Sequence, residues 1–173
     1  MVRFVVGIDP GLTGAVAVLG TDGTIIRVED TPSFLLEGKR RDFNVPGMVN
    51  LLDHGDDLDD LVHETHVFIE RQQSRPEQGV ASVFKIGYGF GLWVGMLSFV
   101  HVPYSIVSPQ TWQRVMYQGA VGEGKERSLL IASRLWPGLV IPKTRHDRAD
   151  ALLIAEYGRR TLLGQTPRWE DVG

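Results

Sequence analysis

Cysteine is absent from the 173 residues of this chain. Its absence excludes disulfide bonds and thiolate-held zinc or iron–sulfur centres. The first residues lack the basic segment and the long apolar run of a signal peptide. The longest apolar stretch, Ile86 to Val100, contains four glycines and is shorter than the roughly 20 residues of a membrane span. We therefore expect a soluble cytoplasmic protein without a membrane partner, folded as a single domain over residues 1–173.

Positive charge is scarce at the two ends of the chain and abundant in the middle. The formal charge of the whole chain is −3. Residues 1–70 hold 5 Lys or Arg against 13 Asp or Glu, whereas residues 71–148 hold 10 against 4. The middle of the chain is thus suited to face a polyanion, although the overall charge is mildly unfavourable for a nucleic-acid partner. We interpret the acidic run before the second apolar segment as a solvated outer edge; it comprises Asp53, Asp56, Asp57, Asp59, Asp60 and Glu64.

The order of apolar segments and turn residues predicts a mixed β-sheet. Strands are expected at residues 2–9, 14–20, Thr24–Val28, Val67–Glu70 and Tyr104–Val107. Residues 30–44 are expected to form an exposed loop. Helices are expected from Pro46 with an apolar stripe of Met48, Leu51 and Leu52, and over residues 76–99, 111–117, 125–136 and 147–163. This order predicts an α/β fold, with one mixed sheet of five strands covered by helices on both faces.

Glycines recur every four residues in the long helix that we expect over residues 76–99. Gly87, Gly91 and Gly95 share one helical face, although each glycine costs about 1 kcal/mol of helix propensity relative to alanine. A glycine stripe lets another backbone approach closely, so packing has to offset that loss. The residues alone leave open whether the stripe packs against the protein's own sheet or against the same helix of a second copy.

Asp9 ends the apolar run Phe4–Ile8 and precedes Pro10-Gly11. As a structural residue, it would initiate the turn. As part of a phosphate loop, it would resemble the first motif of actin-like ATPases and sugar kinases, in which an Asp is followed by a glycine-rich hairpin. As a metal ligand, it would offer a carboxylate from the rigid end of a buried strand. The motif alone does not choose among the three.

Glu70 ends a second apolar run, where burying a charge is expensive without a partner. An ion pair with Arg71 or Arg75 is the structural alternative to a functional role. The loop after Glu70 is rich in side chains that bind phosphates and bases, so we predict DNA contacts from Arg71, Gln72, Gln73 and Arg75.

Asp147 and Asp150 lie three residues apart, and therefore on one face of the last expected helix. An Asp near a helix start is common, because it complements the helix dipole. His146 lies on the same side; it would either support the acids or form an ordinary exposed cap, and we favour the cap. If the acids at the two strand ends and on this helix converge, they repel one another strongly. A pair of divalent metal ions would relieve that repulsion and suits phosphodiester hydrolysis.

Together these segments resemble the acidic signature of the RuvC-type Holliday junction resolvases, which belong to the ribonuclease H-like superfamily. The matching segments are Gly7–Gly11, Ile69-Glu70 and Asp147–Leu152, and the resemblance covers residues 3–160. It implies a ribonuclease H-like fold and a metal-dependent endonuclease. The implied catalytic and metal-binding residues are Asp9, Glu70, Asp147 and Asp150, holding two Mg²⁺ or Mn²⁺ ions per active site.

The resemblance also implies a substrate and a partner. Paired symmetric nicks in a four-way DNA junction would leave 5′-phosphate and 3′-hydroxyl ends, as needed in DNA recombination and repair. The long helix pairs two subunits in that family, which favours a homodimer seam along the glycine stripe. Arg114 and Lys125 occupy positions similar to the family's DNA contacts, and Arg127 is close by.

This chain departs from the family's pattern after the second strand-end acid. Gln72 and Gln73 stand where bacterial members place an aromatic residue that stacks at the junction centre, and residues 30–44 have no assigned counterpart. Such departures suit a phage or otherwise divergent member. They leave three alternatives open: a branched-DNA or flap endonuclease of looser specificity, a non-catalytic DNA-binding protein, and an actin-like ATPase or sugar kinase. The last alternative requires a second, similar half.

Overall fold

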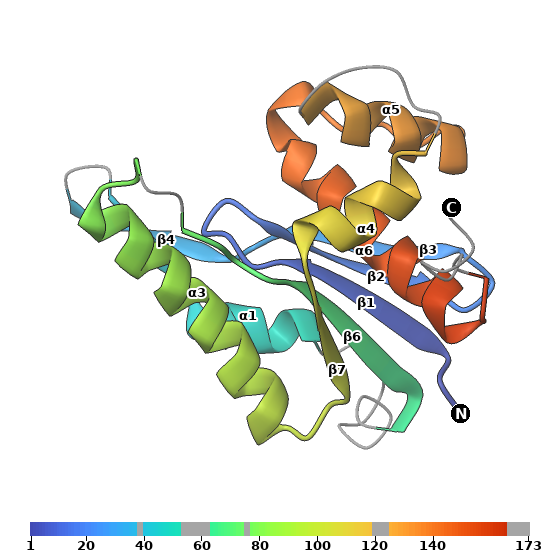
Figure 1. Ribbon diagram of the computed structural model, residues 1–173. Helices are drawn as coiled ribbons and strands as arrows, with labels where there is room; N and C mark the ends of the chain where they lie inside the picture. Colours follow the sequence, from blue (N-terminus) through green and yellow to red (C-terminus); the bar gives the residue numbers. More distant parts are fainter. Residues whose placement is uncertain (38–39, 53–62, 75–76, 119–124, 166–173) are drawn as a thin grey trace.

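The computed structural model describes residues 1–37, 40–52, 63–74, 77–118 and 125–165 (Figure 1). Its strands are β1 (Phe4–Asp9), β2 (Ala15–Gly20), β3 (Ile25–Asp30), β4 (Ser33–Leu35), β5 (Arg41–Phe43), β6 (Thr65–Glu70) and β7 (Tyr104–Val107). Its helices are α1 (Val45–Leu52), α3 (Val80–Phe99), α4 (Pro109–Met116), α5 (Lys125–Leu135), the short 3-10 helix η2 (Lys143–Arg145) and α6 (His146–Leu162). The acidic run at residues 53–60 lies outside the described residues.

Five strands form one mixed sheet in the order β3-β2-β1-β6-β7, which confirms the predicted fold class. β2 runs antiparallel to both of its neighbours, β1 and β3, because tight turns join these strands. β6 and β7 run parallel to β1 and β6 respectively, because longer crossovers precede them. Ile8 on β1 pairs with Ile69 on β6, so the carboxyl ends of these two strands lie side by side.

Helices cover both faces of this sheet, with α1 and α3 on one side and α4, α5 and α6 on the other (Figure 1). Val6 and Ile8 point to the first face, where they join a buried core with Trp93 and Leu97 of α3. The predicted stripe of α1 is buried in the same core, as expected from its spacing; it consists of Met48, Leu51 and Leu52. Because side chains alternate along a strand, the odd-numbered residues of β1 face the other helices.

α6 lies unusually close to β1, at the middle of the second face. A Cβ atom at Gly7 would collide with the backbone of Ala151 and Ala155 on α6. Further along, a Cβ at Gly158 would collide with the Phe68 ring of β6. These small residues let the helix rest directly on the sheet, and this contact brings the first turn of α6 to the carboxyl ends of β1 and β6.

Residues 30–44 do not form the exposed loop that the sequence predicts. β4 and β5 pair as a separate two-stranded antiparallel sheet, and Phe43 at its end is buried. The Phe43 ring meets the ring of Tyr88 on α3 edge-on, with 5.8 Å between the centroids. Each strand has only three residues, too few to show the alternation by which a strand is recognised in sequence.

The glycine stripe of α3 faces away from the rest of the protein. Cβ atoms built at Gly87, Gly91 and Gly95 would meet no described atom within 4 Å. The alternative in which the stripe packs against the protein's own sheet is therefore wrong. Gly89 faces inward instead and packs against Phe43 of β5, because a Cβ at Gly89 would collide with the Phe43 ring.

α3 is also longer than the apolar stretch noted in the sequence, because it begins at Val80 rather than Ile86. An 18-residue part of this helix has a mean hydropathy of 1.4, and 17% of it is buried. By length and composition alone the whole helix is long enough to cross a membrane, whereas the stretch Ile86 to Val100 is not. One such helix is weak evidence for a span.

Candidate metal centre

Asp9 and Glu70 are brought together by the parallel pairing of β1 and β6. Each acid is the last residue of its strand. Gly7 and Phe68 both face α6. Asp9 lies two residues after Gly7, and Glu70 lies two residues after Phe68, so each acid is on the same face of the sheet as its neighbour. Strand alternation therefore turns both carboxylates toward the start of α6.

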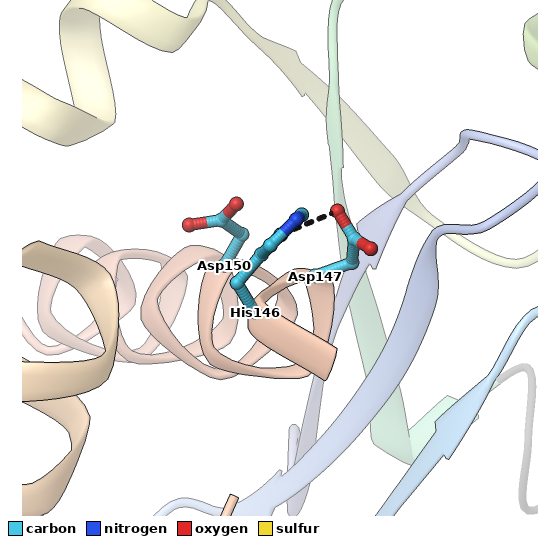
Figure 2. Close-up of side chains that lie close together, drawn as sticks. All are labelled: His146, Asp147 and Asp150. Carbon is cyan, nitrogen blue, oxygen red and sulfur yellow. Dashed lines mark ion pairs between the residues drawn. The ribbon is translucent and has the colours of Figure 1, made fainter. Parts of the chain in front are cut away.

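The start of α6 supplies two further acids and a histidine (Figure 2). One ligand atom each from His146, Asp147 and Asp150 lies within 4.8 Å of the others, a spacing compatible with a shared cation. His146 is the first residue of the helix, and its side chain is only 15% exposed. The interpretation of His146 as an exposed cap was wrong, because its side chain is largely covered and lies inside the first turn of the helix.

The charges of the other three acids all act on Asp9, and that of Asp150 also acts on Glu70. Burial raises the pKa of Asp9 well above its usual range, and the charges of Glu70, Asp150 and Asp147 raise it further. Burial likewise raises the pKa of Glu70 to about 7, although a hydrogen bond from Trp112 opposes the shift. All four acids thus converge at one place, as the sequence predicts.

No basic side chain neutralises the two strand-end acids within the described part of the chain. Neither Asp9 nor Glu70 pairs there with a lysine or arginine, so the alternative of a Glu70–Arg71 ion pair is not formed. Arg145 and Arg148 adjoin the acids in sequence, yet both bind Asp30 on β3, at 2.9 and 2.7 Å. The predicted contact residue Arg75 lies outside the described residues.

The donor set fits a divalent cation. Carboxylate oxygens are the ligands that Mg²⁺ and Mn²⁺ prefer. His146 Nδ1 is buried and forms an ion pair with Asp147 Oδ1 at 2.8 Å (Figure 2). A cation bound among these atoms would relieve the repulsion that raises the pKa of Asp9.

Two residues that the sequence did not single out hold the acids in place. Trp112 Nε1 on α4 donates a hydrogen bond of 2.7 Å to Glu70 Oε2. Ser128 Oγ on α5 donates to Asp150 Oδ1, and Tyr117 lies 2.7 Å from the same serine oxygen. No sequence signal identifies these partners, because a tryptophan and a serine on amphipathic helices ordinarily serve packing and solvation.

The predicted DNA contacts fall into two groups. Arg114 and Arg127 line an open pocket of about 360 Å³, together with Gln110, Gln113, Tyr117 and Gln118. The Arg127 guanidinium lies over the Tyr117 ring at 5.4 Å. Arg71, Gln72 and Gln73 directly follow Glu70 at the same edge of the sheet. Lys125 begins α5, and its side chain is not described. The contacts themselves stay predictions.

Sequence comparisons identify no relative. A scan against models of known protein families finds no match, and no curated protein matches by sequence.

Comparison with solved structures finds RuvC of Thermus thermophilus. Its complex with a Holliday junction substrate matches with a TM-score of 0.61 and 19% sequence identity, over 94% of this chain and 98% of that chain. A second Thermus thermophilus RuvC structure matches with a TM-score of 0.58 and 22% identity over the same shares. The chain therefore has the ribonuclease H-like fold of RuvC, and the resemblance predicted from the acidic signature is confirmed at the level of fold.

Proposed function

We propose that this protein is a divalent-metal-dependent endonuclease that resolves four-way DNA junctions. The observation that supports the proposal most directly is the acidic centre at the start of α6. Asp9, Glu70, Asp147 and Asp150 converge there on a fold shared with RuvC, and burial and mutual repulsion raise the pKa of Asp9. Such a cluster gains stability when cations bind, and a binding site for two divalent ions suits hydrolysis of a phosphodiester.

The chain's own residues have distinct parts in this reaction. Asp9 lies on the central strand and interacts with the charges of all three other acids, so it would hold the ions together with Glu70 and Asp150. Asp147 would hold or orient an ion, and His146 lies beside it. When bound, the ions would supply positive charge beside the scissile phosphate; water would attack the phosphorus as its bond to the 3′ oxygen breaks, and the ends would be a 5′-phosphate and a 3′-hydroxyl. Arg114 and Arg127 would bind backbone phosphates nearby, so binding should weaken with salt.

Cleavage of a labelled synthetic four-way junction tests this function. The wild-type protein with Mg²⁺ or Mn²⁺ should introduce paired, symmetric nicks, and EDTA should abolish them. Asp9→Asn should reduce cleavage by at least about 10³-fold, because about 4 kcal/mol of metal-dependent stabilisation is lost, while junction binding persists. The exposed acid Glu37 provides the control, and Glu37→Gln should cut normally.

Other outcomes of the same experiment identify the alternatives. Equal cutting of flap substrates would support a branched-DNA nuclease, which the glutamines after Glu70 would suit. Tight junction binding without any cutting would support a non-catalytic DNA-binding protein. Thermal stabilisation by ATP in place of DNA cleavage would support the phosphate-loop alternative for Asp9.

We further propose that the active form is a homodimer joined along α3. Phe84 and Phe99 on this helix are 72% and 84% exposed, and the outward glycine stripe lies between them. A bulky residue at Gly91 should leave the fold intact, because its Cβ meets no described atom within 4 Å. Gly91→Trp should therefore sediment as a folded monomer that cuts junctions poorly. A wild-type protein that sediments as a monomer, or an unchanged dimer in the variant, would exclude this seam.

A further inference from the structure

Two of the acids are held by buried donors on helices that carry no acid of the cluster. Trp112 on α4 and Ser128 on α5 are 0% and 1% exposed. Trp112 Nε1 donates to Glu70 Oε2 at 2.7 Å, and Ser128 Oγ donates to Asp150 Oδ1. Each donor reaches its acid from a different part of the chain, 42 and 22 residues away.

The direction of these hydrogen bonds follows from the chemistry of the groups. An indole N–H can only donate, and an ionised carboxylate can only accept. The single proton of the Ser128 hydroxyl is committed to Asp150, so the Tyr117 hydroxyl, 2.7 Å away, must donate to Ser128. Tyr117 and Ser128 thus form a chain of two donors that leads to the accepting carboxylate of Asp150.

A hydrogen bond to one oxygen of a carboxylate also restricts the orientation of its second oxygen. Glu70 has a long side chain, whose free rotation would be lost when it binds a cation. The indole prevents that rotation in advance, because Trp112 is itself fixed by packing against the Tyr117 ring, edge-on at 5.4 Å. The indole N–H offers no lone pair to a cation, and the Ser128 oxygen already donates to Asp150 and accepts from Tyr117, so both residues are suited to orient ligands.

We propose that Trp112 and Ser128 are positioning residues, which preorganise Glu70 and Asp150 to bind a divalent cation. This inference rests on the proposed metal-dependent function. Partners that orient metal ligands typically contribute about 10- to 100-fold to metal affinity or activity. Trp112→Phe and Ser128→Ala should therefore each weaken Mn²⁺ binding by about 10-fold or more.

The chain offers a matched control for each variant. Trp136 donates its indole N–H to the Gly23 carbonyl oxygen at 3.0 Å, away from the acids. Ser133 lies on the same helix as Ser128 and donates to the Leu130 carbonyl oxygen. Trp136→Phe and Ser133→Ala each remove a similar hydrogen bond, so they report any general effect on stability.

Isothermal titration calorimetry with Mn²⁺ and no DNA tests the inference, together with the Tm of each metal-free protein and the EPR spectrum of bound Mn²⁺. We expect weaker Mn²⁺ binding and an altered spectrum for Trp112→Phe and Ser128→Ala only. Affinities equal to those of the controls, with Mn²⁺ still bound by the wild type, would overturn the positioning role and leave the proposed function intact. A wild type that binds no Mn²⁺ would overturn both. Since the two variants alter different helices, misfolding of one leaves the other as the test.

Discussion

Acids lie at the amino end of α6 and in its carboxyl half, and their negative charges are compensated in opposite ways. Near its carboxyl end, Glu156 is 4% exposed and accepts hydrogen bonds of 2.7 Å from Arg159 and from Arg160. Although burial raises its pKa, these two arginines bring the pKa of Glu156 below its usual value. At the amino end, burial and neighbouring acids raise the pKa of Asp9, and no arginine in the described residues pairs with it.

This difference separates a stabilising pair from a binding site. The charge of Glu156 is neutralised by two arginines of its own helix, so no bound ligand is needed there. The acids at the amino end destabilise the metal-free protein by their repulsion, and they are retained next to arginines that bind elsewhere, such as Arg148 with Asp30. A charge left unneutralised inside a folded protein is a recognised sign of a functional site, since a ligand can supply the missing partner.

The largest expected effect is on the pH dependence of stability, to which the acids at the two ends of α6 contribute with opposite sign. The pKa of Glu70 rises from 4.5 to about 7 on folding, so the folded protein binds the proton more tightly. Metal-free protein should therefore lose stability as the pH rises from 4.5 to about 7, by up to about 3 kcal/mol. Glu156, whose pKa is lowered, contributes stability that is present above its unfolded pKa and lost as the pH falls below it.

Urea denaturation at a series of pH values in EDTA measures how the free energy of unfolding changes with pH. Glu70→Gln should flatten the loss of stability toward neutral pH, and saturating Mg²⁺ should reverse it. Metal-free wild-type protein that becomes more stable between pH 5 and 7 would contradict the assignment of Glu70.

The second effect is the loss of the stabilising pair. Glu156→Gln leaves the guanidinium groups of Arg159 and Arg160 without their charged acceptor, although Arg159 keeps its bond to the Thr21 carbonyl oxygen. We expect a loss of about 2 kcal/mol in the free energy of unfolding, below the usual range for a fully buried pair because Arg160 is 30% exposed. Mn²⁺ affinity, measured by calorimetry, should be unchanged. A matching loss of Mn²⁺ affinity would show that the two ends are not independent.

The smallest effect is a gain in stability when one repelling acid is removed. Asp9→Asn should stabilise the metal-free protein, because it removes a carboxylate whose pKa is raised by burial and by the charges of its neighbours. Urea denaturation in EDTA and in Mn²⁺ should show that the order reverses, with the wild type more stable once the metal is bound. A destabilised Asp9→Asn protein in EDTA would indicate a structural role for Asp9 in the turn.

Much of the fold could be predicted from the sequence because its elements are strongly apolar and clearly bounded. β7 was expected at Tyr104–Val107 and lies there, and the stripe of α1 is buried as its spacing predicts. The β4–β5 hairpin was missed because its short strands show no periodicity. The start of α3 was misplaced because Pro76 suggested an earlier first turn, whereas the helix begins at Val80.

The acids of the candidate site were predictable for a related reason. Asp9 and Glu70 each end a buried strand, and parallel strands place their carboxyl ends at one edge of a sheet. The burial of His146 could not be predicted in this way, because it depends on how closely α6 approaches the sheet. That approach is set by Gly7 against Ala151, two positions far apart in the chain.

The sequence by itself determined the strand ends, the order of the acids and the local pairing of Glu156 with arginines three and four residues ahead, because each depends on neighbours in the chain. Only the tertiary structure decided that Arg148 turns to Asp30, that Trp112 and Ser128 hold Glu70 and Asp150, and that Gly89 rather than Gly91 packs inward. Such contacts join distant segments, so they are fixed by how whole helices pack on the sheet, which local propensity does not encode.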